Sequence, residues 1–307
     1  MSTIITSPAL TNQQHSLRLL RPSFFGLVRG EIFKVVRQWT PWIALVLMLG
    51  IIGLPFLLFF TTSGLKELIL SPHYDYFYER MPIGFALLRA FGGIVLVVIT
   101  ARIIGQEYSL GTIRVVLARG VGRVQLLLAK MTATALLALA LVTIGLLEIA
   151  LLSTVQIQLV AGSLNPLISL PASVWHDFGL YLLAILLSMG ATLLMTTAVS
   201  VIFHSLAGAL SASIIWFPID NMLVLMLSLI FRLTKSDFWL NVTAYLLGPN
   251  LNALAGLLAQ RSGSIWQFGF GPQITVDSTH ALLVALVYSL IFAAVAIIFT
   301  WKRDVQE

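Results

Sequence analysis

The apolar positions of this chain form long runs separated by short charged segments, a pattern typical of a helical membrane protein. A helix needs roughly 20 apolar residues to cross a bilayer, and the gaps between charges mark six such segments. We predict spans at about residues 41–62, 82–104, 132–156, 178–203, 206–231 and 281–300. The uncharged run of residues 178–219 is too long for one helix, so we expect a turn within it at His204 and Ser205.

A different periodicity precedes the first span, in residues 22–40. Its apolar positions recur at helical spacing and its polar positions fall on the opposite side: Phe25, Val28, Ile32, Val36 and Trp39 against Glu31, Lys34, Arg37 and Gln38. We predict an amphipathic helix in the membrane interface, with its polar side toward the headgroups and the cytosol. Either it only anchors the topology, or it also contacts a cytosolic partner. Residues 1–21 are polar and contain no apolar run, which predicts a flexible cytosolic tail.

The composition supports an all-α transmembrane domain over residues 41–307 and argues against a soluble protein. Hydrophobic residues make up 59% of the 307 and charged residues only 10%, with a mean hydropathy of +0.98. A soluble domain carries roughly a quarter charged residues. The net charge of +6 is explained by basic residues in cytoplasmic loops, so we expect a lipid bilayer and no nucleic acid as a partner.

Sequence motifs for catalysis are missing. There is no cysteine, no Gly-x-x-x-x-Gly-Lys-Ser/Thr phosphate loop, no His-Glu-x-x-His pair and no Gly-x-Ser-x-Gly elbow. We therefore expect that the chain is not an enzyme and binds no cofactor or metal of its own.

Lysine and arginine are distributed unevenly over the predicted loops. Twelve of the 18 lie before the first span, around the loop between the second and third spans, or at the C-terminus. By the positive-inside rule this predicts a multi-pass protein of the cytoplasmic (inner) membrane with both termini cytoplasmic. On the other side, the long loop 232–280 contains an apolar stretch that Gly248-Pro249 interrupts, and we expect it to pack on or dip into the outer leaflet.

Three charged residues lie well inside the predicted spans, where charges are costly and usually functional or paired. Arg89 and Glu148 lie at matching depth, roughly 10–12 Å below the outer boundary at about 1.5 Å per residue, which suggests a buried ion pair. Either the pair is structural or Arg89 snorkels toward the interface, or the two residues contact substrate or form a gate. Asp220 lies nearer the middle of the membrane beside Pro218. It is protonated, faces a dimer seam or polar cavity, or caps a helix break, and the sequence does not rank these alternatives.

The loop between the second and third spans carries the pattern Glu-x-x-x-Gly-Thr-x-Arg-x-x-Leu-x-Arg-x-x-x-Arg-x-x-x-x-x-x-Lys. Together with six spans, an interfacial helix and a closing Lys302-Arg303-Asp304, it resembles the ABC-2-type permeases, the membrane subunits of bacterial ABC exporters. The matching positions are Glu107, Gly111, Thr112, Arg114, Leu117, Arg119, Arg123 and Lys130. Gly120-Val-Gly122 replaces a proline and serine that are common in that family.

This resemblance implies a function that no catalytic motif reveals. Residues 109–118 would form a coupling helix, with Ser109 capping its start and the arginines of the loop 105–131 binding acidic groups of a separate cytosolic ATPase. Glu107 would anchor the loop to a nearby basic residue. The ATPase would bind ATP and Mg. A second permease subunit, either identical to this chain or different from it, would complete the translocation path. The alternatives are that these arginines only set topology, or that the chain is an ion- or proton-coupled secondary carrier.

Overall fold

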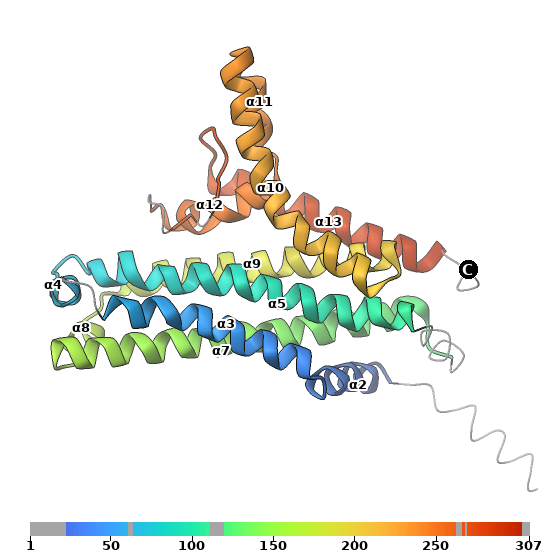
Figure 1. The fold of residues 1–307 in the computed structure, drawn as a ribbon, viewed down its shortest axis with the longest axis horizontal. Coiled ribbons are helices and arrows are strands. Elements are labelled where there is room, and N and C mark those ends of the chain that lie inside the picture. The colour runs from blue at the N-terminus through green and yellow to red at the C-terminus, as the bar shows by residue number, and fades with distance from the viewer. Residues whose placement is uncertain (1–22, 61–63, 111–119, 262–265, 268, 303–307) are drawn as a thin grey trace, which may run out of the picture.

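The computed structural model describes residues 23–60, 64–110, 120–261, 266–267 and 269–302. Among these residues, six helices are long and apolar enough to cross a membrane, and no strand occurs. The chain is therefore an all-α, multi-pass membrane protein (Figure 1). The six are α3 (Trp39–Phe59), α5 (Met81–Ser109), α7 (Arg123–Ala161), α9 (Ala172–Phe203), α10 (Leu206–Thr234) and α13 (Ser278–Lys302).

Shorter helices connect or flank these six. Helix α2 (Phe24–Val36) precedes α3, and a π-helical turn (Tyr76–Arg80) leads directly into α5. The others are α4 (Leu65–Leu70), α8 (Asn165–Ile168), α11 (Phe238–Thr243) and α12 (Leu247–Ala259). We call the end of the bundle that carries α2, the last turn of α5 and the first turn of α7 the loop end, and the end that carries α4 and α8 the distal end (Figure 1).

Helices α5 and α7 extend further toward the loop end than we predicted. Helix α5 continues to Ser109 and α7 already begins at Arg123, so the connection between them is residues 110–122 rather than 105–131. Both helices therefore continue past the ends of the predicted spans, because charged residues do not interrupt a helix. The predicted turn between the fourth and fifth spans is confirmed: His204 has a φ of 51°, and the Ser205 hydroxyl accepts a hydrogen bond from Gly208 N at 3.0 Å.

Helix α5 lies at the centre of the bundle. In its most apolar stretch 67% of the residues are buried, against 17% in α10 and in α13. Close packing requires small residues here, because a Cβ added at Gly145 of α7 would collide with the Leu88 side chain of α5. Leu88 is fully buried and thereby fixes the register between these two helices.

The segment between α10 and α13 differs from the broken stretch that we predicted. Gly248 and Pro249 fall in the first turn of α12 and do not interrupt it. Proline is tolerated there because the first amides of a helix have no partner within the helix. Most of α12 is buried, and it packs against α9 and α13. Helix α12 is therefore part of the bundle core.

Helix α10 follows the bundle for only part of its length. It contains Pro218, and its last buried residue is Val224. The later part of α10, together with α11, projects sideways from the bundle (Figure 1).

Candidate functional site

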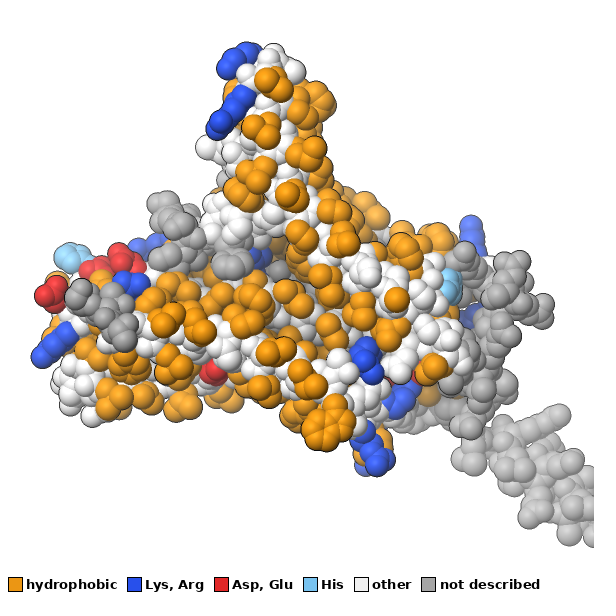
Figure 2. Space-filling view, in the orientation of Figure 1, with side chains coloured by type: hydrophobic (Ala, Val, Ile, Leu, Met, Phe, Trp, Pro, Cys, Tyr) orange, Lys and Arg blue, Asp and Glu red, His pale blue; other side chains and the backbone are white. Residues whose placement is uncertain are grey.

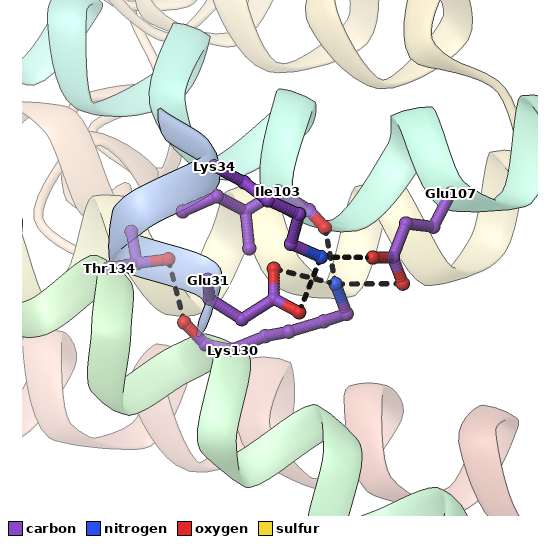
Figure 3. Close-up of polar contacts among 6 residues, drawn as sticks. All are labelled: Glu31, Lys34, Ile103, Glu107, Lys130 and Thr134. Carbon is purple, nitrogen blue, oxygen red and sulfur yellow. Dashed lines mark hydrogen bonds and ion pairs between the residues drawn. The ribbon is translucent and has the colours of Figure 1, made fainter. Parts of the chain in front are cut away.

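Four charged side chains from three helices meet at the loop end (Figure 3). Lys34 Nζ of α2 lies 2.7 Å from Glu31 Oε1 on the same helix and 2.5 Å from Glu107 Oε1 of α5. Lys130 Nζ of α7 lies 3.2 Å from Glu31 Oε2 and 2.9 Å from Glu107 Oε2. Each carboxylate thus bridges both lysines. We call these four residues the ionic cluster.

The position of each residue of the ionic cluster follows from the helix that carries it. Glu31 and Lys34 are three residues apart and share one face of α2. Glu107 is one turn beyond Ile103 on α5, and the Ile103 carbonyl accepts a hydrogen bond from Lys130 Nζ at 2.7 Å. The lysine ammonium therefore satisfies the α5 backbone as well as two carboxylates. Glu107, which we expected to pair with a nearby basic residue, forms ion pairs with both Lys34 and Lys130.

The cluster is electrically balanced but unevenly buried. Two carboxylates face two ammonium groups, and the side chains of Lys130 and Lys34 are 4% and 49% exposed. Burial lowers the pKa of Lys34, but hydrogen bonds and Coulombic attraction from Glu107 and Glu31 outweigh it and raise that pKa above its ordinary value. Lys34 therefore stays charged at neutral pH and holds α2 to α5.

A cavity of about 340 Å³ opens beside the cluster. Its lining includes Glu31, Lys34 and Glu107 of the cluster, and also Gln38 and Arg102. Arg102 Nε donates to Gln38 Oε1 at 2.8 Å, which adds a second polar link between α5 and the N-terminal segment. The cavity gives the side chains of the cluster room to change partners.

Helix α2 does not present the face that we predicted. Its buried residues are Val28, Glu31 and Val35, and it packs against α7 around Ala129 and Ala133. The prediction that Glu31 points to headgroups and cytosol is wrong, because Lys34 and Lys130 compensate its burial. Phe25 and Trp39 are more than four-fifths exposed, as expected for side chains that face lipid.

Ser109, which we predicted to cap a coupling helix, links two described helices. It is the last residue of α5, and its hydroxyl donates to Gly105 O at 3.1 Å and accepts from Leu206 N at 2.9 Å. It therefore joins the loop end of α5 to the start of α10. Arg123, another predicted coupling residue, begins α7. The remaining coupling candidates lie outside the described residues: Gly111, Thr112, Arg114, Leu117 and Arg119.

A second polar region lies within the bundle, at the junction of α5, α10 and α12. Arg89 is buried and donates to Leu251 O at 3.1 Å and to Asn252 Oδ1 at 2.9 Å. Asn252 Nδ2 in turn donates to Asn221 Oδ1 at 3.1 Å. Asn221 and Asn252 were not among our predicted site residues, because an amide in an apolar segment carries no charge to mark it.

The predicted ion pair between Arg89 and Glu148 is not formed. No ion pair joins the two side chains, which both lie in the described part of the chain. Arg89 is turned toward α12, whereas Glu148 lies beside α3, where its Oε1 is 3.3 Å from the position of a Cβ at Gly53. Matching depth is not enough for contact, because the two side chains point to different sides of their helices.

Asp220 is engaged with the start of another helix. Its Oδ2 accepts a hydrogen bond from the backbone N of Gly248, in the first turn of α12. A carboxylate at this position satisfies an amide that has no partner within the helix and interacts favourably with the helix dipole. This contact is closest to our third alternative, in which Asp220 caps a helix break. The helix that it caps is α12, however, and not an end of α10 broken at Pro218. We call Arg89, Asp220, Asn221, Gly248, Leu251 and Asn252 the mid-bundle network.

Comparison with known proteins gives a family without a function. A search of curated proteins returned no match. The model of the DUF2705 family, described as a protein of unknown function, matches residues 74–306. This match includes five of the six spanning helices, Glu107 and Lys130 of the ionic cluster, and the whole mid-bundle network. The chain therefore belongs to the DUF2705 family.

Proposed function

We propose that this protein is the membrane-spanning permease subunit of an ATP-driven transporter of the ABC-2 type, an exporter in which two permease subunits form the path. A separate cytosolic ATPase would dock on the loop of residues 110–122 and bind the ATP and Mg. The motif resemblance motivates this proposal, and the ionic cluster is the observation that carries it.

The cluster has the properties that a mechanical link needs. The loop 110–122 is bounded by α5 and α7, and Glu107 and Lys130 lie within two or three turns of its ends. Their direct ion pair at 2.9 Å joins the two helices, and Lys34 adds α2. A push on the loop therefore reaches three helices at once, including α5 at the centre of the bundle.

Ion pairs suit this role better than apolar packing. Charged groups that share several partners can exchange them when helices shift by a few ångströms, whereas interdigitated cores have few alternative arrangements. The cavity beside the cluster supplies the space for such an exchange. The N-terminal helix α2 would then act as a connecting helix as well as an interfacial one.

The test is co-purification of the full chain with its ATPase from native membranes in mild detergent. We expect the wild type to retain a stoichiometric ATPase and the double variant Arg114→Glu/Arg119→Glu to lose it, because reversed charges repel an acidic docking groove. Lys66→Glu, on α4 at the distal end, is the matched control and should retain the ATPase.

The possible results separate the hypotheses. Retention by the double variant would contradict docking at this loop. Absence of an ATPase from intact wild type and control would contradict the proposed function and favour an ion-coupled carrier.

A further inference from the structure

The cavity beside the ionic cluster lies where the apolar lengths of two spanning helices end. Gln38, which lines it, directly precedes Trp39, the first residue of α3. Arg102, which also lines it, follows the uncharged residues 90–101 of α5. The hydrogen bond of 2.8 Å from Arg102 Nε to Gln38 Oε1 shows that the two ends are at one level. Tryptophan is enriched at membrane interfaces, and Trp39 and Trp42 lie at this end of α3. The cavity is therefore at the boundary of the apolar layer, where lipid headgroups begin.

The side chains around the cavity carry one positive charge in excess. The ionic cluster is balanced, with two carboxylates and two ammonium groups. Arg102 adds a further positive charge, and no carboxylate pairs with it among the described residues. Its side-chain hydrogen bond to Gln38 uses Nε, and in the part of the chain that the structure describes no acceptor is bound to its two terminal nitrogens. A ligand with one negative charge would balance this site.

A phosphate group matches these donors. The planar fork of an arginine forms two parallel hydrogen bonds with phosphate oxygens. Lys34 lines the same cavity and is half exposed. It can turn toward a phosphate without leaving Glu107 unpaired, because Lys130 also binds that carboxylate. Glu31 lines the cavity as well, but it too is already paired with both lysines.

The size of the cavity suits a headgroup rather than a whole lipid. Its volume of about 340 Å³ is at the lower end of the range of roughly 300–1,000 Å³ that is typical of ligand sites. The acyl chains of a lipid would therefore have to lie outside it, on an apolar surface that begins at the cavity.

Both helices offer such a surface. On α3, Trp42 and Val46 follow Gln38 at helical spacing and are at least half exposed. On α5, Ile94 lies about two turns before Arg102 and is exposed. Figure 2 shows apolar side chains over α3 and basic ones where α3 meets α2. A lipid with its phosphate in the cavity can lay its acyl chains along these residues.

We propose that this cavity binds the phosphate of an anionic phospholipid such as phosphatidylglycerol, with Arg102 as the principal donor and Lys34 as the second. An anionic lipid brings one negative charge, which balances Arg102. A zwitterionic lipid such as phosphatidylcholine also brings a cation and leaves the excess charge in place. The bound lipid would hold α2 against α5. This site goes beyond the proposed function and requires no ATPase.

The test is native mass spectrometry of the purified full-length chain from micelles that contain phosphatidylglycerol and phosphatidylcholine in equal amounts. We expect the wild type to retain phosphatidylglycerol in preference to phosphatidylcholine. Arg102→Gln should lower the affinity for phosphatidylglycerol about tenfold or more, because it removes charged hydrogen bonds, and should leave retention of phosphatidylcholine unchanged. Arg37→Gln is the matched control: it makes the same charge change at an exposed position of the same end, outside the lining of the cavity. It should keep the preference of the wild type.

Gln38→Glu provides a second test that keeps Arg102 and the shape of the site. The introduced carboxylate accepts from the same Arg102 Nε and balances its charge within the protein. We expect the preference for phosphatidylglycerol to be lost while the temperature of unfolding stays at or above that of the wild type. Because the link between Arg102 and position 38 is retained, this variant decides the question even if Arg102→Gln does not fold. A preference that survives Gln38→Glu would contradict the proposal.

Three further results would overturn it. One is equal retention of the two lipids by the wild type. Another is an equal loss in Arg102→Gln and Arg37→Gln, which would indicate only the general attraction of basic residues to anionic lipid. The third is displacement of phosphatidylglycerol by an excess of inorganic phosphate, which would mean that the cavity binds free phosphate. All of these measurements use the chain alone, so their failure leaves ATPase docking to be judged by the co-purification.

Discussion

The ionic cluster at the loop end and the mid-bundle network both contain buried charges, but they satisfy these charges in different ways. In the cluster, Lys130 and Lys34 pair with carboxylates on neighbouring helices. In the network, Asp220 accepts from a backbone amide and Arg89 donates to a backbone carbonyl and a neutral amide. The two regions thus hold helices together by different means.

This difference bears on what each region can do. Flexible side chains that pair with each other can change partners while helices move, so the cluster suits a link that transmits motion. A bond to the first turn of a helix is fixed by the backbone, so the network suits a rigid anchor that holds α12 to α5 and α10. We therefore expect substitutions in the cluster to depend on charge and substitutions in the network to depend on shape.

The largest effect is expected at Lys130. Replacement by methionine keeps much of its volume but leaves Glu31 and Glu107 facing each other with only Lys34 to compensate. Removing one partner of a buried ion pair costs about 3–5 kcal/mol, and Lys130 is almost completely buried. Lys34→Met should cost about 1 kcal/mol or less, because that side chain is half exposed and water screens its charge. The free energy of unfolding in mixed detergent micelles, followed by tryptophan fluorescence, measures both.

Leu128→Met, at an exposed position of the same helix turn, is the control for this pair and should be neutral. Equal effects of Lys130→Met and Lys34→Met would mean that burial does not set the strength of the cluster.

An intermediate effect is expected where α12 meets Asp220. A Cβ at Gly248 would lie 2.5 Å from Asp220 Oδ2, so Gly248→Ala must displace the carboxylate or the helix. Overpacking of this kind costs about 1–3 kcal/mol. Asp220→Asn keeps an acceptor oxygen for the Gly248 amide and should cost less than about 1 kcal/mol. The free energy of unfolding, measured in the same way, compares Gly248→Ala with Asp220→Asn.

The control for Gly248 is Gly190→Ala on α9, where nothing lies within 4 Å of the added Cβ. It should stabilise the helix by up to about 1 kcal/mol through its higher helix propensity. A larger loss from Asp220→Asn than from Gly248→Ala would instead indicate that the charge of Asp220, rather than its fit against Gly248, stabilises this junction.

Hydropathy was sufficient to predict the six spans and the turn at His204, since a bilayer requires long apolar runs and a turn requires a break between them. It did not predict that Glu31 is buried, because Lys130, which compensates its charge together with Lys34, is far away in the sequence. Charges also concealed the true ends of α5 and α7. The spacing of charges along one chain does not show which side chains are close in three dimensions, so these contacts could not be predicted from it.

The smallest effect is the coupling between Arg89 and Glu148, whose predicted pairing failed because depth along a helix leaves the direction of a side chain undetermined. Arg89→Ala should cost about 1–3 kcal/mol, because it leaves the acceptors at Leu251 and Asn252 without a donor. Since Arg89 faces α12 and Glu148 faces α3, combining Arg89→Ala with Glu148→Ala should be additive within about 0.5 kcal/mol. The matched cycle of Arg89→Ala with Asn252→Ala should show a coupling of about 0.5–3 kcal/mol, because these two side chains share a hydrogen bond. Coupling to Glu148 that equals the coupling to Asn252 would mean that the network is electrostatic after all, and would remove the distinction between a rigid anchor and a movable cluster.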